Sequence, residues 1–277
     1  MSTRVRVLGP RDRTAVTDFL ALRPVETLFL AAKISSFGLD RRRVGVLHGF
    51  ERDNELAGVC LDGGTVFPAT HDPEAIPRFV EVLGPVRRAS SILGPSQAAL
   101  GLYVGLSERW PGAWASVSNV RQRQPLMLLD APPTMLGDER VRALTPRDFG
   151  AYLDASVKMY TEEIGSSPFK HGPGYESFVQ DRLRHDDAYG IVEDGEVLFK
   201  ADLGPRLGSH TQLQGVWVRP DQRGKRLAVS ALASMLRRVM TRYTHVSLYV
   251  NDFNTPAVKV YQRLGFETVG SLSTVHY

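Results

Sequence analysis

The chain has 277 residues, of which 43% are hydrophobic and 23% are charged. This composition is typical of a folded globular protein and excludes a disordered one, and the length favours two domains because single cores rarely grow beyond roughly 250 residues. The formal net charge of +4 fits an anionic ligand as well as nucleic acid, so it does not decide between these two partners.

The first residues give no sign of export. Met1 to Leu8 alternate charged and apolar side chains, unlike the continuous apolar core of a signal peptide. No window approaches the roughly 18 apolar residues of a membrane span, so we expect a cytoplasmic protein that has no membrane partner. The single cysteine, Cys60, lies in an apolar run, where we expect a buried strand residue and not a nucleophile.

The sequence repeats itself about half a chain apart. Val5 to Asp12 (VRVLGPRD) and Val141 to Asp148 (VRALTPRD) match at six of eight positions, and each predicts a short strand, a proline turn and a following helix. Further on, Asp53-Asn54 and Asp194-Gly195 both stand between apolar runs and predict β-hairpins. Two matches in the same order predict a duplicated fold.

The two copies are expected to meet in a segment that interrupts regular structure. Pro132, Pro133 and Gly137 lie close together there. We therefore place the domains at residues 1–134 and 135–277.

The second half contains a strand, a basic turn and a helix in succession. Thr211 to Val218 is rich in β-branched and aromatic residues and predicts a strand that Pro220 ends. The basic turn follows, and then a helix whose apolar residues recur every three or four positions. These apolar residues are Ala228, Leu232, Met235, Leu236, Val239 and Met240. Free backbone N–H groups and the helix dipole at such a turn predict a phosphate or pyrophosphate ligand.

A second strand and helix follow. His245 to Val250 predicts a strand, after which Thr255 can cap a helix that has Pro256 at its first position. Gly265 stands where the helix would end. Ala257, Tyr261 and Leu264 are spaced by four and three residues and therefore share one face of this helix.

Together these segments resemble the CoA-binding motifs of the GNAT N-acetyltransferase superfamily. The first motif is similar to Arg223-Gly-Lys-Arg-Leu-Ala228, and the second to the pattern of Asn251, Asn254, Ala257, Tyr261, Gly265 and Phe266. The resemblance implies an α/β fold with a mixed, mostly antiparallel sheet that splays open between two parallel strands. For the whole chain it implies two GNAT-like domains in tandem, with the acetyl-CoA site in the C-terminal domain.

The resemblance also implies roles for the matching positions. Main-chain groups of Val216, Trp217 and Val218 would lie beside the pantetheine and polarise the thioester carbonyl. Asn254 would hydrogen-bond the pantetheine arm, with Ala257 in the same motif, and Tyr261 would protonate the departing thiolate. Backbone N–H groups would hold the pyrophosphate; these belong to Arg223, Gly224, Lys225, Arg226, Leu227 and Ala228.

Two positions depart from the family pattern. Arg226 stands where the family usually has glycine. Gln212 stands where many members have a glutamate base, and glutamine cannot accept a proton. Glu162 and Glu163 are the main alternative candidates for the base; water, His171 and His210 are others.

The first half lacks these motifs. Its strand at residues 64–70 corresponds to Thr211–Val218, but the turn that follows has no glycine and contains Asp72 and Glu74, which would repel a phosphate. We therefore expect a degenerate copy that serves as a scaffold or as one wall of the acceptor pocket.

The leading hypothesis is acetyl-CoA-dependent N-acetylation of an amine by direct attack, without a metal. The acceptor amine could belong to a small molecule or to a protein. Transfer of a longer acyl or aminoacyl group is one alternative, and a CoA-sensing regulatory or scaffold protein is another. Nothing in the sequence matches a recognised nucleic-acid-reading module, so a nucleic-acid partner is not expected.

Overall fold

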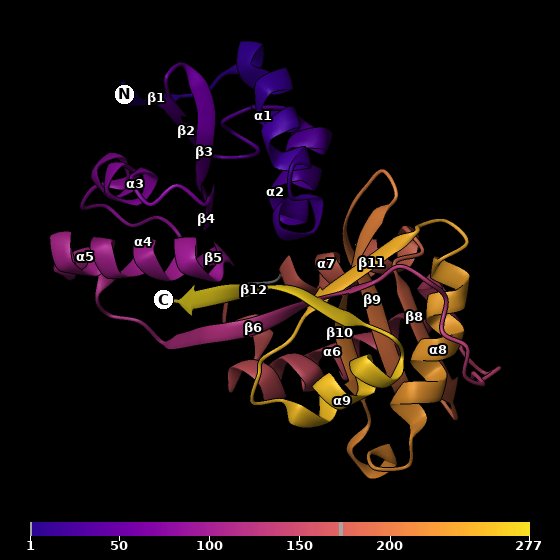
Figure 1. Ribbon diagram of the computed structural model, residues 1–277. Helices are drawn as coiled ribbons and strands as arrows, with labels where there is room; N and C mark the ends of the chain where they lie inside the picture. The colour runs from indigo at the N-terminus through magenta and orange to yellow at the C-terminus, as the bar shows by residue number, and fades with distance from the viewer. Residues whose placement is uncertain (1, 172–173) are drawn as a thin grey trace. The chain divides into compact units, whose positions relative to one another are not determined.

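The computed structural model describes residues 2–171 and 174–277 as a mixed α/β protein (Figure 1). The chain forms two compact units. Unit 1 comprises Met1–Met127, Tyr249–Asn254 and Thr268–Tyr277, and unit 2 comprises Leu128–Leu248 and Thr255–Glu267. The division is therefore not a single cut, because unit 1 includes a strand that the chain forms only after passing through unit 2.

Unit 1 is built around an open sheet with strand order β1-β2-β3-β4-β5-β12-β6. Strands β4 and β5 pair in parallel, whereas the pairs β1–β2, β2–β3, β3–β4 and β5–β12 are antiparallel. The elements are β1 (Thr3–Val7), η1 (Pro10–Asp12), α1 (Arg13–Ala21), α2 (Pro24–Phe37), β2 (Val46–Arg52), β3 (Glu55–Asp62), β4 (Thr65–Thr70), α3 (Ala75–Leu83), β5 (Ser91–Pro95), α4 (Ser96–Arg109), α5 (Pro111–Trp114), β6 (Asn119–Leu129) and β12 (Glu267–His276).

Unit 2 contains the strand order β11-β10-β9-β8-β7. Only β10 and β11 pair in parallel among these strands, whose residues are all described. The elements are β7 (Arg142–Ala143), η2 (Pro146–Asp148), α6 (Phe149–Ile164), η3 (Pro168–His171), α7 (Gly174–Arg184), β8 (Ala188–Glu193), β9 (Glu196–Leu207), β10 (His210–Val218), η4 (Pro220–Gln222), α8 (Leu227–Val239), β11 (His245–Tyr249) and α9 (Thr255–Arg263). Figure 1 shows α8 in front of these strands and α6 behind them.

The two units share one order of elements, as a duplicated fold predicts. From β1 to β5 and again from β7 to β11, the chain forms a strand, a short 3-10 turn, two helices, three antiparallel strands, a helix and a parallel strand. Between β7 and β11, the described part of unit 2 adds two further 3-10 turns, η3 and η4.

The repeated octapeptide forms the same contact in both units. Arg6 donates two hydrogen bonds to the Asp12 carboxylate, at 3.0 and 2.7 Å, and Arg142 donates two to Asp148, at 2.8 and 2.7 Å. In each case the aspartate also accepts a backbone N–H at 2.8 Å, three residues before it in the chain. The sequence identity between the halves thus preserves a bidentate ion pair that fixes the start of the first helix.

The two predicted hairpins are also confirmed. Asp53 and Asn54 have φ angles of 50° and 69°, and Asp194 and Gly195 have φ angles of 49° and 77°. Positive φ at both central residues is the signature of a type I′ turn, whose twist matches that of the paired strands. The turns join β2 to β3 and β8 to β9.

Helices cover the sheets with apolar faces. In α8 the residues Leu232, Met235, Leu236 and Val239 are fully buried, as their spacing predicts. Cys60 is a fully buried residue of β3, which confirms its structural role. Among the described helices, none is both long enough and apolar enough to cross a membrane.

Candidate active site

The parallel strands of unit 2 separate along their length. Pairing between β10 and β11 runs from His210–His245 to Gln212–Ser247, whereas β10 continues to Val218. The C-terminal part of β10 therefore has a main-chain edge that β11 does not cover. This is the splayed arrangement that the family resemblance implied.

A β-bulge interrupts β10 next to this separation. The register with β9 shifts between Gln214 and Trp217, and Gly215 has a φ of +59°, a conformation that favours glycine. Regular pairing resumes at Trp217, which lies opposite Lys200. The bulge turns the main chain of Gly215 and Val216 out of the β9 ladder and frees its polar groups for other partners.

The turn after β10 presents backbone donors at the start of α8. Among the described residues, the N–H groups of residues 224–228 donate to no backbone acceptor, whereas the N–H of Arg223 donates to the Pro220 carbonyl at 3.2 Å. Such N–H groups, together with the positive end of the helix dipole, form an anion site. Arg226 precedes the helix with a φ of +64°, so the position where the family usually has glycine keeps the left-handed conformation.

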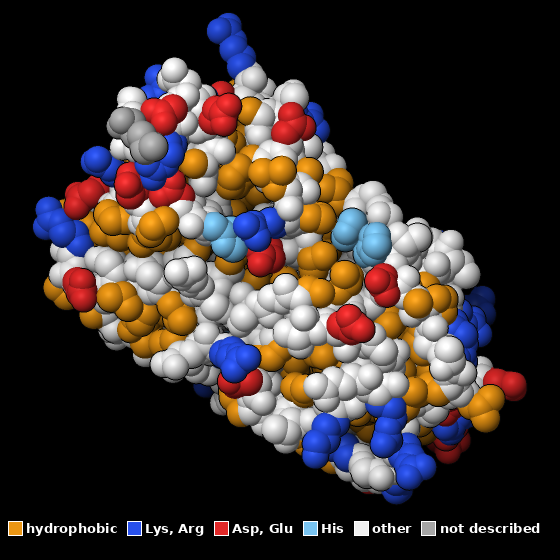
Figure 2. Space-filling view, viewed as in Figure 1, with side chains coloured by type: hydrophobic (Ala, Val, Ile, Leu, Met, Phe, Trp, Pro, Cys, Tyr) orange, Lys and Arg blue, Asp and Glu red, His pale blue; other side chains and the backbone are white. Residues whose placement is uncertain are grey.

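Ion pairs neutralise some of the basic side chains at this turn and leave others exposed. Arg219 is paired with Asp221 and Glu196, and Arg223 is paired with Glu162. Lys225 and Arg226 are exposed and form no ion pair within the described part of the chain. In Figure 2, Lys and Arg side chains gather where Figure 1 shows the loop between β10 and α8.

Glu162 connects the bulged strand to this turn. Its carboxylate accepts a hydrogen bond from the Trp217 indole at 3.3 Å and one from the Arg223 guanidinium at 2.6 Å. Both carboxylate oxygens of Glu162 are thus engaged in hydrogen bonds that link the strand to the turn. Glu162 is therefore better suited to position the turn, and Glu163 remains the candidate for the base.

Tyr261 lies on α9 with 7% of its surface exposed. Its ring packs edge-on against Phe266, with the centroids 5.8 Å apart. Burial raises the pKa of the phenol, and the negative charge of Glu163 raises it further. Tyr261 is protonated at neutral pH, as any tyrosine is, and the raised pKa makes it a weaker acid than an ordinary tyrosine.

The structure also places three other residues that the sequence analysis considered. Asn254 is an exposed residue of unit 1 whose N–H donates to the Asn251 carbonyl at 2.9 Å, whereas Ala257 is half-buried on α9 in unit 2. Gln212 is buried at the paired start of β10 and β11.

Neither histidine gains support as a base. The ring centroids of His210 and His245 lie 4.5 Å apart with the rings tilted, and burial, followed by the neighbouring His245, lowers the pKa of His210. His210 begins β10, at the opposite end from the bulge. The side chain of His171 lies outside the described part of the structure.

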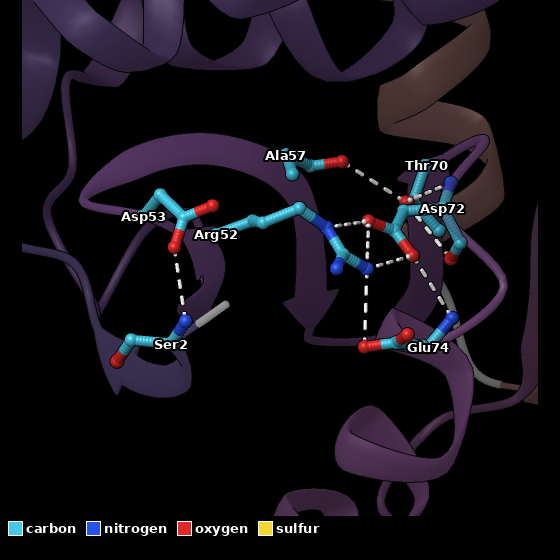
Figure 3. A network of polar contacts seen from close by, with 7 residues as sticks. All are labelled: Ser2, Arg52, Asp53, Ala57, Thr70, Asp72 and Glu74. Atoms are coloured by element: carbon cyan, nitrogen blue, oxygen red, sulfur yellow. Dashed lines mark hydrogen bonds and ion pairs between the residues drawn. The ribbon is translucent and has the colours of Figure 1, made fainter.

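The corresponding turn of unit 1 is closed by its own side chains (Figure 3). Between β4 and α3, the Asp72 carboxylate accepts the backbone N–H of Glu74 at 3.0 Å. Arg52 donates to the same carboxylate at 2.8 and 3.0 Å, and its guanidinium lies 3.1 Å from the Glu74 carboxylate. Asp72 thus occupies the position that an anion would take before a helix, and Arg52, which the sequence analysis did not identify, neutralises it.

A buried charged group beside the β10 bulge was not predicted from the sequence. Lys200 and Asp202 lie on β9, and Tyr152 lies on α6. A lysine inside the apolar run Val197-Leu-Phe-Lys-Ala201 is the sequence signal that could have identified this group.

Comparison with known proteins agrees with the geometry. Residues 154–266 match the acetyltransferase (GNAT) family, and residues 45–152 match DUF4081, a domain of unknown function. An L-methionine sulfoximine/L-methionine sulfone acetyltransferase from Pseudomonas aeruginosa is 35% identical over 143 residues, which span 47% of this chain and 83% of that protein.

Solved structures share the fold at low sequence identity. A GNAT-family acetyltransferase from Colwellia psychrerythraea has a TM-score of 0.60 and 12% identity, with 99% of each chain covered. A tandem GNAT protein from the clavulanic acid biosynthesis pathway has a TM-score of 0.57 and 12% identity, with 99% of this chain and 98% of that chain covered. The family match, the identity with the Pseudomonas enzyme and the splayed, bulged strand together show that the chain belongs to the GNAT family and is an N-acetyltransferase.

Proposed function

We propose that the protein transfers the acetyl group of acetyl-CoA to the primary amine of a small molecule, and that unit 2 holds the acetyl-CoA. The observation that carries this proposal is the sequence of features along β10 and α8. A bulge beside the splayed strands is followed by a turn where, among the described residues, the N–H groups have no backbone acceptor and Lys225 and Arg226 form no ion pair. The bulge suits the thioester, the splayed strands suit the pantetheine arm, and the turn suits the pyrophosphate.

Binding would use main-chain groups more than side chains. The N–H groups of residues 224–228 would hold the pyrophosphate, with Lys225 and Arg226 adding charge. The main chain of residues 216–218 would lie beside the pantetheine, and one of its N–H groups would stabilise the developing oxyanion. Ala257, on α9 of unit 2, would complete the pantetheine contacts.

The reaction would proceed by direct attack. The neutral amine would bond to the thioester carbon, and collapse of the tetrahedral intermediate would break the C–S bond. The thiolate would take the proton of Tyr261, and the amine would give up a proton to Glu163 directly or through water. The products are an N-acetyl amide and free CoA.

Two variants separate the proposed roles of the neighbouring glutamates. Glu163→Gln should lower kcat at neutral pH, because it removes the proton acceptor. Glu162→Gln is the matched control one residue away, and we expect it to raise KM for acetyl-CoA through its contact with Arg223. Equal kcat values for the parent and Glu163→Gln, measured where chemistry limits the rate, would assign the proton to water.

Small α-amino acids are the acceptors that we propose first. The Pseudomonas relative is named for two methionine derivatives, L-methionine sulfoximine and L-methionine sulfone. Both have an α-amino group that can attack a thioester once it is neutral. In this proposal unit 1 binds no acetyl-CoA, since Asp72 and Arg52 fill the turn that would hold its phosphates.

A mass-resolved screen tests the proposal. The full chain is incubated with acetyl-CoA and a panel of amines: the two methionine derivatives, ordinary α-amino acids, polyamines and peptides. Longer acyl-CoAs are run in parallel. We expect acetylation of a small amine with an equal amount of free thiol released. Binding of acetyl-CoA without transfer to any amine would instead support a CoA-sensing protein, and preference for a longer chain would change the assigned donor.

A further inference from the structure

A lysine with no exposed surface lies directly beneath the β10 bulge. Lys200 has a relative exposure of 0%. Its ammonium group donates to the Asp202 carboxylate at 2.8 Å and to the Gly215 carbonyl at 3.0 Å, and it lies 3.6 Å from the sulfur of Met159. A buried ammonium group is tolerated only when its donors have partners, and this set provides them.

The partner carboxylate is itself held in place. Asp202 is 7% exposed and accepts a hydrogen bond from the Tyr152 hydroxyl at 2.7 Å through its second oxygen. The Lys200 ammonium also lies 5.2 Å from the centre of the Tyr152 ring, within the range of a cation–π contact. Helix α6 and strand β9 therefore fix both members of the ion pair.

The ion pair packs closely against Gly215 in the bulge. A Cβ added at Gly215 would overlap the Asp202 carboxylate and lie 3.1 Å from the Lys200 ammonium. Only glycine therefore fits between the ion pair and the main chain. The register shift leaves Gly215 outside the β9 ladder. Its left-handed φ directs its carbonyl to the Lys200 ammonium group instead.

We propose that Lys200 is a positioning residue for acetyl transfer, because it fixes the Gly215 carbonyl and thereby orients the following N–H groups toward the thioester. Asp202 and Tyr152 hold Lys200 in this position. The proposal rests on the proposed function, in which residues 216–218 lie beside the thioester. Lys200 touches neither substrate and acts only through the shape of the bulge.

The main test replaces both charges at once. Lys200→Met alone would leave the Asp202 carboxylate buried without its cation, so we combine it with Asp202→Asn, which can still accept the Tyr152 hydrogen bond. The matched control is Arg206→Met with Asp187→Asn, which removes an ion pair that Arg206, on the same strand β9, forms away from the bulge. Tyr152→Phe is the milder variant, because it keeps both charges and the ring.

The readout is the carbonyl stretch of acetyl-CoA labelled with carbon-13 at the thioester, bound to the full chain and followed by infrared difference spectroscopy. An N–H hydrogen bond to the carbonyl lowers this frequency. We expect the shift to be present in the parent and the control and to be largely lost in the double variant, with Kd for acetyl-CoA changed by less than about twofold. In the same double variant kcat should fall about tenfold or more, with KM for acetyl-CoA little changed, since loss of one oxyanion donor costs about 10²- to 10³-fold.

A parent-like carbonyl shift in the folded double variant overturns the proposal. If the double variant does not fold, Tyr152→Phe decides, and there we expect a smaller loss of the shift in the same direction; an unchanged shift overturns the proposal equally. A parent protein that binds no acetyl-CoA refutes the proposed function itself, and this inference with it.

Discussion

Arg226 offers a test of the phosphate site that separates backbone strain from charge. With a φ of +64°, Arg226 holds a left-handed conformation that costs a residue with a Cβ about 1–2 kcal/mol. Arg226→Gly removes this strain but gives the unfolded chain more freedom, which costs about 0.4–1 kcal/mol. We therefore expect the free energy of unfolding to stay the same or to rise by up to about 1.6 kcal/mol.

For ligand binding, by contrast, we expect replacement of Arg226 to be unfavourable, because its positive charge is lost. One exposed contact between a guanidinium and a phosphate is worth about 1 kcal/mol, or about fivefold in Kd. Arg226→Ala loses this contact and keeps the Cβ, so it should weaken acetyl-CoA binding about fivefold. Arg226→Gly should weaken binding less, because the backbone can then approach the pyrophosphate more closely.

Titration calorimetry with the full chain at low and high salt measures these effects. The two Arg226 variants should lose less affinity than the parent between the two salt concentrations, because they make one fewer contact to phosphate. Arg184→Ala is the control, since Arg184 is an exposed arginine on α7. Parent-like affinity of Arg226→Ala at low salt would refute the placement of the phosphates at this turn.

Three further predictions test other parts of the molecule. Tyr261→Phe keeps the buried ring, so thermal stability and Kd for acetyl-CoA should change little while kcat falls roughly 10²-fold; turnover at the parent rate would leave Tyr261 a packing residue only. Calorimetry should give one acetyl-CoA per chain, and a value near two would contradict the closed turn at Asp72. Arg142 lowers the pKa of Asp148, so this pair contributes stability above the ordinary aspartate pKa of about 4, and the contribution is lost as pH falls through the lowered value. In thermal melts from about pH 7 to pH 2, the melting temperature of Asp148→Asn should therefore decline less than that of the parent. Parallel curves would show that the ion pair does not contribute to the loss of stability in acid.

Local signals were sufficient for much of the fold. The strand, basic turn and helix from β10 to α8 were predicted because proline, glycine and a clear apolar spacing mark each boundary. Helix α2 was not predicted, because its sequence is apolar on most sides and shows little periodicity. Helix α7 was not predicted either, since few of its residues are apolar.

The candidate site was predictable only where a contiguous motif defines it. The turn at residues 223–228 and Tyr261 follow from such motifs. The group around Lys200 does not, because Tyr152 and Gly215 lie far from it in the chain and meet only through the packing of α6 and β10 on β9. The same holds for Arg52 and Asp72, which are 20 residues apart and come together through the pairing of β2, β3 and β4.

The position of β12 has a consequence for synthesis and for experiments on fragments. This strand pairs with β5 in the sheet of unit 1, yet the ribosome makes its residues 268–276 after all of unit 2. Unit 1 therefore cannot complete its sheet until unit 2 has been synthesised. Although unit 1 begins first in the chain, it is completed last. A fragment that begins at residue 135 would contain β12 without β5 and expose an unpaired edge strand, which is a site for aggregation. Deletion of β12 would damage the N-terminal unit, far from the deletion in sequence.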